Sequence, residues 1–288
     1  MSTPQHPLSE SEFKALLHLL DDEDEEVSAH VWAQLMALGE SGVERLEAEW
    51  LTASDPEMQR RLEEVISRIH RKSLAQELLE WRKDGGRDLL RGWYLVSKFQ
   101  FPDLDFQKYR NEINRLVNKT WLELSNQMDA SQKLKVVNHL LFKMEGYGPN
   151  ATRPNFPHNS HLNYLIDHQQ GNAVSLGLLY LIICKQLDLQ VSGVILPGYF
   201  ILYHNDGKQE FYIDVFNGGH AFNRARLEGY LKQVNLPEKP SYFQPTSNIY
   251  IILNLIRTIA HDYGTNDKTD KVAELEELLE DIDIKFDV

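Results

Sequence analysis

The sequence predicts an α+β fold in which helices precede and follow a small antiparallel sheet. Apolar residues recur at helical spacing through the first half of the chain and again after residue 224. Three runs between these stretches, at 190–196, 199–204 and 210–216, are typical of strands. The sequence Asn205-Asp206-Gly207 is a strong hairpin signal, so the last two strands should pair antiparallel.

Residues 1–84 are predicted to form a helical region. Ser9 and Glu12 make a capping-box pattern before the first apolar stripe. A spacing of 31 residues relates Asp24 to Asp55, and it also relates the apolar stripes that follow them. The stretches DDEDEEV and SDPEMQRR resemble the turns of degenerate HEAT-type repeats, whose stacked helices offer an extended surface to partners. The alternative interpretation is two amphipathic helices that happen to share a register.

The glycine pair Gly85-Gly86 favours a boundary there, so a central domain is predicted over residues 85–240. An apolar stripe predicts a long helix at 106–124. Ser131 is predicted to cap the next helix, with Met144 among its inward-facing residues.

A loop is predicted at 146–159, because glycines, prolines and asparagines crowd this segment, and it is long enough to be functional. A short helix around 162–166 and the most apolar helix of the chain, around 176–187, should follow. Residues 241–288 are predicted to form a C-terminal helical pair packed on the central domain.

Composition excludes several classes of function. The 43 acidic and 30 basic side chains give a net charge of -13, which has the wrong sign for binding nucleic acid or an anionic membrane surface. The single cysteine excludes an intrachain disulfide and a cysteine-rich metal site, and it suits a reducing compartment. With no secretory signal pattern and no apolar run near the ~20 residues that a spanning helix needs, the sequence predicts a cytoplasmic protein. No phosphate-binding or dinucleotide fingerprint is present, so no cofactor is predicted.

Four short motifs occur in an order and spacing that resemble the transglutaminase-like core of the bacterial SirB-type proteins, a branch of the papain-like superfamily. The resemblance covers about residues 100 to 230 and implies a buried helix packed on a small antiparallel sheet. It also implies a tetratricopeptide-like tail, which the C-terminal helices resemble. The motifs are Asn159-Ser160, Gly171-Asn172-Ala173-Val174-Ser175-Leu176, Pro197-Gly198-Tyr199-Phe200, and Asp214-Val215-Phe216 with Gly218 and Gly219.

The resemblance also indicates where a catalytic site would lie. Catalytic members of the superfamily use a cysteine at the start of the buried helix, a histidine on the next strand and an aspartate that orients the histidine. These positions match Ser175, Tyr199 and Asp214. A phenol with a pKa near 10 cannot replace imidazole as a base near neutrality, so the set is expected to be inactive. Ser175 would then cap its helix, Asp214 would hold the strands, and Gly171, Asn172 and Gly198 would shape the groove.

Other candidate groups are weaker. His220 follows Asp214 and is the candidate for a displaced base, whereas strand alternation predicts that His204 points away from Ser175. Cys184 lies on the opposite face of the predicted helix from Ser175 and should be buried. The histidines at 158, 161 and 168 fit no metal-ligand template, so no metal site is predicted.

The leading hypothesis is a degenerate, non-catalytic transglutaminase-like protein, a pseudoenzyme that acts as a protein-interaction or regulatory module. A groove that has lost its base keeps its shape while losing the chemistry. Its partner would be a protein or peptide, and the oligomeric state is left open. The alternative hypothesis is an acyl transferase or amide hydrolase that uses Ser175 with His220 as base. Whether the 146–159 loop covers the groove is also left open.

Overall fold

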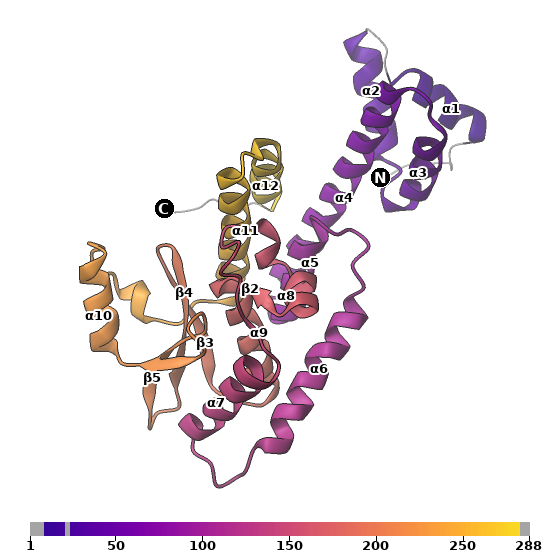
Figure 1. Cartoon of the computed structure of the whole chain (residues 1–288). Coiled ribbons are helices and arrows are strands. Elements are labelled where there is room, and N and C mark those ends of the chain that lie inside the picture. The colour runs from indigo at the N-terminus through magenta and orange to yellow at the C-terminus, as the bar shows by residue number, and fades with distance from the viewer. Residues whose placement is uncertain (1–8, 21–23, 283–288) are drawn as a thin grey trace. The chain divides into compact units, whose positions relative to one another are not determined.

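A computed structural model describes residues 9–20 and 24–282 (Figure 1). The chain divides into two compact units, one ending at Glu77 and one beginning at Leu78. None of the described helices is long and apolar enough to cross a membrane. The same residues contain no group of three histidine, cysteine, aspartate or glutamate side chains that could hold a metal ion.

The first unit is helical, as predicted. Ser9 and Glu12 form the expected capping box. The Asp24 side chain accepts hydrogen bonds from the backbone N–H groups of Glu26 and Val27, in the first turn of the next helix. Apolar side chains from all of its helices share one core, with Phe13, Leu35 and Val65 fully buried or nearly so. Residues 21–23 of the predicted acidic turn lie outside the described residues, and the HEAT-type repeat stays a prediction. The helices are α1 (Glu10–His18), α2 (Glu25–Met36), α3 (Val43–Thr52) and α4 (Pro56–Lys83), the last of which continues into the second unit.

The second unit is built around α9 (Ala173–Gln186), whose residues from Val174 to Cys184 are all buried. This helix contacts α5, α6 and the strand β4. The C-terminal helices pack on each other, and α11 also contacts α5. The remaining helices are α5 (Leu89–Lys98), α6 (Phe106–Glu123), α7 (Ala130–Asn138), α8 (Leu162–His168), α10 (Arg224–Gln233), α11 (Asn248–Thr265) and α12 (Thr269–Asp281).

The sheet is antiparallel, with strand order β3-β4-β5-β6, and together with the helices it confirms the α+β prediction. The predicted hairpin joins β4 to β5, and the Asn205 and Asp206 side chains accept backbone hydrogen bonds within the turn. A fourth strand, which the sequence analysis did not predict, places His220 opposite Asp214. The strands are β3 (Val191–Leu196), β4 (Tyr199–Asn205), β5 (Glu210–Asp214) and β6 (His220–Phe222); β1 (Gly148–Pro149) and β2 (Gln170–Gly171) form a separate parallel pair.

The two faces of this sheet carry different helices (Figure 1). Helix α9 packs on the face that holds Phe200 and Leu202, and Gly177 is required there because a Cβ atom would collide with the Phe200 ring. The other face holds Ile201 and packs against α10. Because neighbouring residues of a strand alternate between faces, Tyr199 lies with Ile201 on the α10 face. The sequence analysis had assigned α9 to the wrong face, so His204 lies on the α9 side of the sheet rather than away from it.

Three local predictions were wrong or missing. Asp129, not Ser131, caps α7, and it forms a capping box with Gln132. Met144 is 61% exposed, because residues 139–144 form a π-helical turn that shifts the helical register away from the predicted stripe. Helix α5, most of whose residues are buried, was not predicted, because the segment after Gly85-Gly86 was interpreted as a domain boundary.

Candidate functional site

A half-open cavity of about 780 Å³ lies over the α10 face of the sheet. Tyr199 enters it from the start of β4, Asp214 from the end of β5 and His220 from the start of β6. The fold therefore brings three of the four candidate catalytic residues to one cavity. Its other lining residues are Lys143, Leu196, Ile201, Asn217, Gly218, Phe222, Arg226, Leu227 and Tyr230.

Tyr199, Asp214 and Asn217 form one hydrogen-bonded group in this cavity. The Tyr199 hydroxyl donates to Asp214 Oδ1 at 2.8 Å, and Asn217 Nδ2 donates to Asp214 Oδ2 at 2.7 Å. The Asn217 backbone N–H also donates to Oδ1 at 3.2 Å. Burial, and next the hydrogen bond to Asp214, raise the pKa of Tyr199 well above its ordinary value. At neutral pH Tyr199 is thus a neutral donor and does not act as a base.

His220 is exposed at the rim of the cavity and is oriented by the backbone. Its Nδ1 lies 2.8 Å from the carbonyl oxygen of Asn217. A carbonyl oxygen can only accept, so Nδ1 donates in this hydrogen bond. Asn217 therefore links the two residues, because its carbonyl oxygen bonds His220 and its side-chain amide bonds Asp214.

Ser175 lies on the opposite side of the sheet, in the first turn of α9. It belongs to a capping box with Asn172, in which Asn172 Oδ1 accepts from the Ser175 N–H and Ser175 Oγ accepts from the Asn172 N–H, both at 3.0 Å. Ser175 is fully buried, and Gly171 closes over it so tightly that a Cβ atom at Gly171 would collide with Ser175 Oγ. Among residues 9–20 and 24–282, no imidazole forms a hydrogen bond with Ser175.

Of the predicted groove residues, Gly171 and Asn172 lie beside Ser175, and Gly198 lies in the β3–β4 turn. None of the three lines the Tyr199 cavity. Asn172 Nδ2 donates to Ser160 Oγ at 2.7 Å, which ties the start of α9 to the preceding turn. Gly198 has φ +70° in the tight turn after Pro197, a conformation that favours glycine. Asn217 was not predicted as a site residue, although it lies within the motif that runs from Asp214 to Gly219. An amide three residues after an aspartate at a strand end was the available signal.

Comparison with known proteins identifies the family to which the chain belongs. A model of the transglutaminase-like superfamily matches residues 107–257, which is more than half of the chain. The chain belongs to this family. The match includes Ser175, Tyr199, Asp214 and His220, and it confirms the recognised resemblance.

Three curated relatives show the SirB-type branch. A UPF0162 protein of Xylella fastidiosa (strain Temecula1) is 25% identical over 185 residues, covering 62% of this chain and 66% of the relative. UPF0162 protein YchA of Escherichia coli K12 is 26% identical, with 59% and 65% covered. Protein SirB1 of Salmonella typhimurium is 29% identical, with 50% and 54% covered. The matches thus span between about half and two thirds of these relatives. No solved structure matches the chain.

Two other candidates in the second unit, Cys184 and the loop at 146–159, do not line the Tyr199 cavity. Cys184 is fully buried, and burial raises the pKa of its thiol, which makes it a poor nucleophile. Residues 146–159 contribute nothing to the lining of the Tyr199 cavity. This loop is instead held by its own contacts, such as the Asn150 side chain donating to Asn159 and the Asn159 amide donating to the Arg153 carbonyl.

Proposed function

We propose that this protein is a non-catalytic member of the transglutaminase-like family that binds a peptide segment of a protein partner in the Tyr199–Asp214 cavity. The observation that carries the proposal is the separation of Ser175 from Tyr199 and Asp214 by the sheet. Acyl transfer by this family's chemistry needs nucleophile and base within hydrogen-bond reach, roughly 2.6–3.2 Å. The Ser175 hydroxyl instead forms hydrogen bonds with the backbone N–H and carbonyl of Asn172.

The alternative of a hydrolase that uses Ser175 with His220 requires these two side chains to meet. His220 lies at the cavity on the α10 side and bonds the Asn217 carbonyl, whereas Ser175 is sealed under Gly171 on the α9 side. An alcohol is a weak nucleophile without an adjacent base. The arrangement therefore favours binding over chemistry.

The cavity has the character of a peptide site. Its wall combines apolar side chains with the rings of Tyr199 and Tyr230, whose centroids are 6.3 Å apart. Tyr230 is 37% exposed, and Arg226 and Lys143 add positive charge at the rim. Tyrosine and arginine are the residue types that dominate binding energy at protein interfaces. A peptide with an apolar anchor and a neighbouring acidic residue would match this lining.

A peptide-display selection with the full chain as bait tests the proposal. Enriched peptides should bind the natural chain and lose at least tenfold in affinity to Tyr230→Ala, because the substitution removes an exposed ring of the cavity wall. The matched control is Tyr250→Ala, which removes a tyrosine that is 63% exposed on α11 and lines no described cavity. Turnover of ester or amide substrates that disappears in both Ser175→Ala and His220→Ala would instead establish the enzyme.

A further inference from the structure

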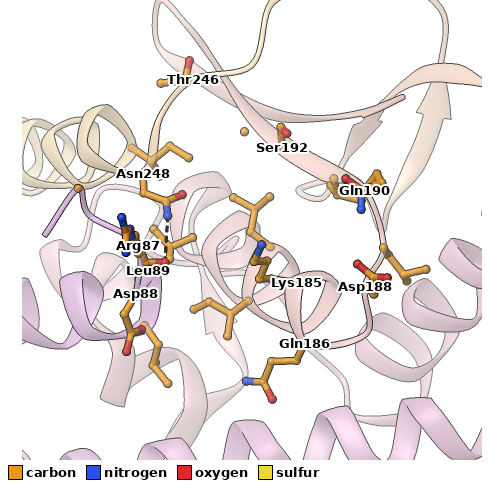
Figure 2. A pocket seen from close by; sticks show the side chains of 18 of the residues that line it. Arg87, Asp88, Leu89, Lys185, Gln186, Asp188, Gln190, Ser192, Thr246 and Asn248 are labelled. Carbon is orange, nitrogen blue, oxygen red and sulfur yellow. Dashed lines mark hydrogen bonds between the residues drawn. The ribbon is translucent and has the colours of Figure 1, made fainter. Parts of the chain in front are cut away.

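A second cavity, of about 930 Å³, lies in the same unit and shares no lining residue with the Tyr199 cavity. This half-open cavity is lined by the end of α9, one face of α6, the start of β3 and the loop before α5 (Figure 2). We propose that this cavity binds a small organic anion that carries several negative charges, as carboxylates or as phosphate.

Three basic side chains from three different segments line this cavity. Lys185 comes from the last turn of α9, Arg110 from α6 and Arg87 from the loop before α5. Within the part of the chain that the structure describes, none of the three side chains forms an ion pair or a hydrogen bond. All three residues are exposed, whereas Arg115, for example, pairs with two glutamates. Basic side chains that line a cavity without acidic partners attract anions into it.

The acidic residues of the lining do not cancel this charge. The Asp88 carboxylate is used as the N-cap of α5, where it accepts the Arg91 N–H at 2.9 Å. Figure 2 shows the Asp88 side chain turned away from Lys185, whose ammonium group points into the cavity. Asp188 lies at the other end of the cavity from Arg87 (Figure 2). Within the described residues, neither carboxylate forms an ion pair with Arg87, Arg110 or Lys185.

The site is held in shape before any ligand arrives. Asn248 Nδ2 donates to the carbonyl of Gly86 at 2.9 Å, which fixes the loop that carries Arg87 to the start of α11 (Figure 2). Phe106, Arg110 and Asn114 are spaced by four residues along α6 and all face the cavity. Apolar side chains such as Ile182 and Ile251 complete the lining. A cavity of this size, lined by polar groups as well as apolar side chains, suits a small molecule better than a long polymer.

Isothermal titration calorimetry of the full chain with citrate and, separately, with pyrophosphate tests this proposal. One of the two anions or both should bind, and the one that binds identifies the carboxylate or the phosphate source. Lys185→Gln and Arg87→Gln should each weaken binding about tenfold, as expected for loss of one charge-assisted contact. Lys185→Arg should retain binding. The control Lys135→Gln makes the same charge change at an exposed position outside the cavity and should leave the affinity unchanged.

The proposal fails if neither anion binds at millimolar concentration. It also fails if Lys135→Gln weakens binding as much as Lys185→Gln does, which would indicate non-specific charge attraction. Binding of an acidic hexapeptide without binding of either small anion would overturn it in favour of a protein partner. Because the peptide selection reports on the Tyr199 cavity, the two proposals can fail independently.

Discussion

His161 should make the stability of the second unit depend on pH. Its side chain is fully buried, and neither ring nitrogen has a hydrogen-bond partner. The ring packs edge-on against Phe101, with centroids 5.4 Å apart, and lies 5.9 Å from the ring of His158. Burial, and next the nearby His158, lower the pKa of His161 from 6.5 to about 3. The imidazole is therefore held neutral in the folded protein.

The size of the effect follows from this shift. Because the folded pKa is depressed, the unfolded chain binds the proton more readily between pH 6.5 and pH 3, and folding stability falls as the pH drops through that window. At pH 5 the solution is 1.5 units below the unfolded pKa, and one unit corresponds to about 1.36 kcal/mol. His161 should thus remove about 2 kcal/mol of stability between pH 8 and pH 5.

Urea unfolding followed by tryptophan fluorescence at both pH values measures this loss. His161→Phe keeps a ring at the same place without a titrating group, so its stability should fall by about 2 kcal/mol less than that of the natural chain. His168→Gln, at the exposed end of helix α8, which begins directly after His161, is the control and should follow the natural chain. Equal losses in the natural chain and in His161→Phe would refute the reasoning, because they would show that His161 is not held neutral by burial.

Three further substitutions probe the site. Ser175→Ala removes the side-chain half of the α9 capping box and should lower the free energy of unfolding by about 1 kcal/mol in a urea titration; no loss would mean that the cap is not formed. Gly177→Ala places a Cβ atom against the Phe200 ring and should cost about 1–3 kcal/mol, whereas Gly229→Ala, on α10 with no atom near its Cβ position, should not destabilise the chain. Tyr199→Phe removes the hydrogen bond to Asp214 and should cost about 1 kcal/mol; a spectrophotometric titration in which Tyr199 ionises at its ordinary pKa would contradict the buried hydrogen bond.

Local signals predicted much of the fold. The capping box of Ser9 and Glu12 and the turn at Asn205-Asp206-Gly207 depend on residues a few positions apart, and both formed as expected. Helix α5 was missed although its sequence is amphipathic, because the segment after Gly85-Gly86 was interpreted as a domain boundary. Its burial comes from contacts with α9 and α11, which lie far away in the sequence and which no local signal shows.

The candidate site, too, was predicted only as far as local sequence signals allow. The order of the motifs placed Tyr199 and Asp214 together, because strand pairing follows from the hairpins. The side of the sheet on which α9 packs depends on a contact between Gly177 and Phe200, residues on different elements. Alternation along β4 fixes which residues share a face but not which face meets the helix. Ser175 was therefore assigned to the wrong side of Tyr199.

The central claim is that Ser175 is a buried helix cap and not a nucleophile. Intact mass spectrometry after treatment with a fluorophosphonate, which labels activated serines, tests it directly. The account predicts no added mass at Ser175, because its hydroxyl is sealed under Gly171 and bonded to Asn172. A single adduct that maps to Ser175 and disappears in Ser175→Ala would contradict the account.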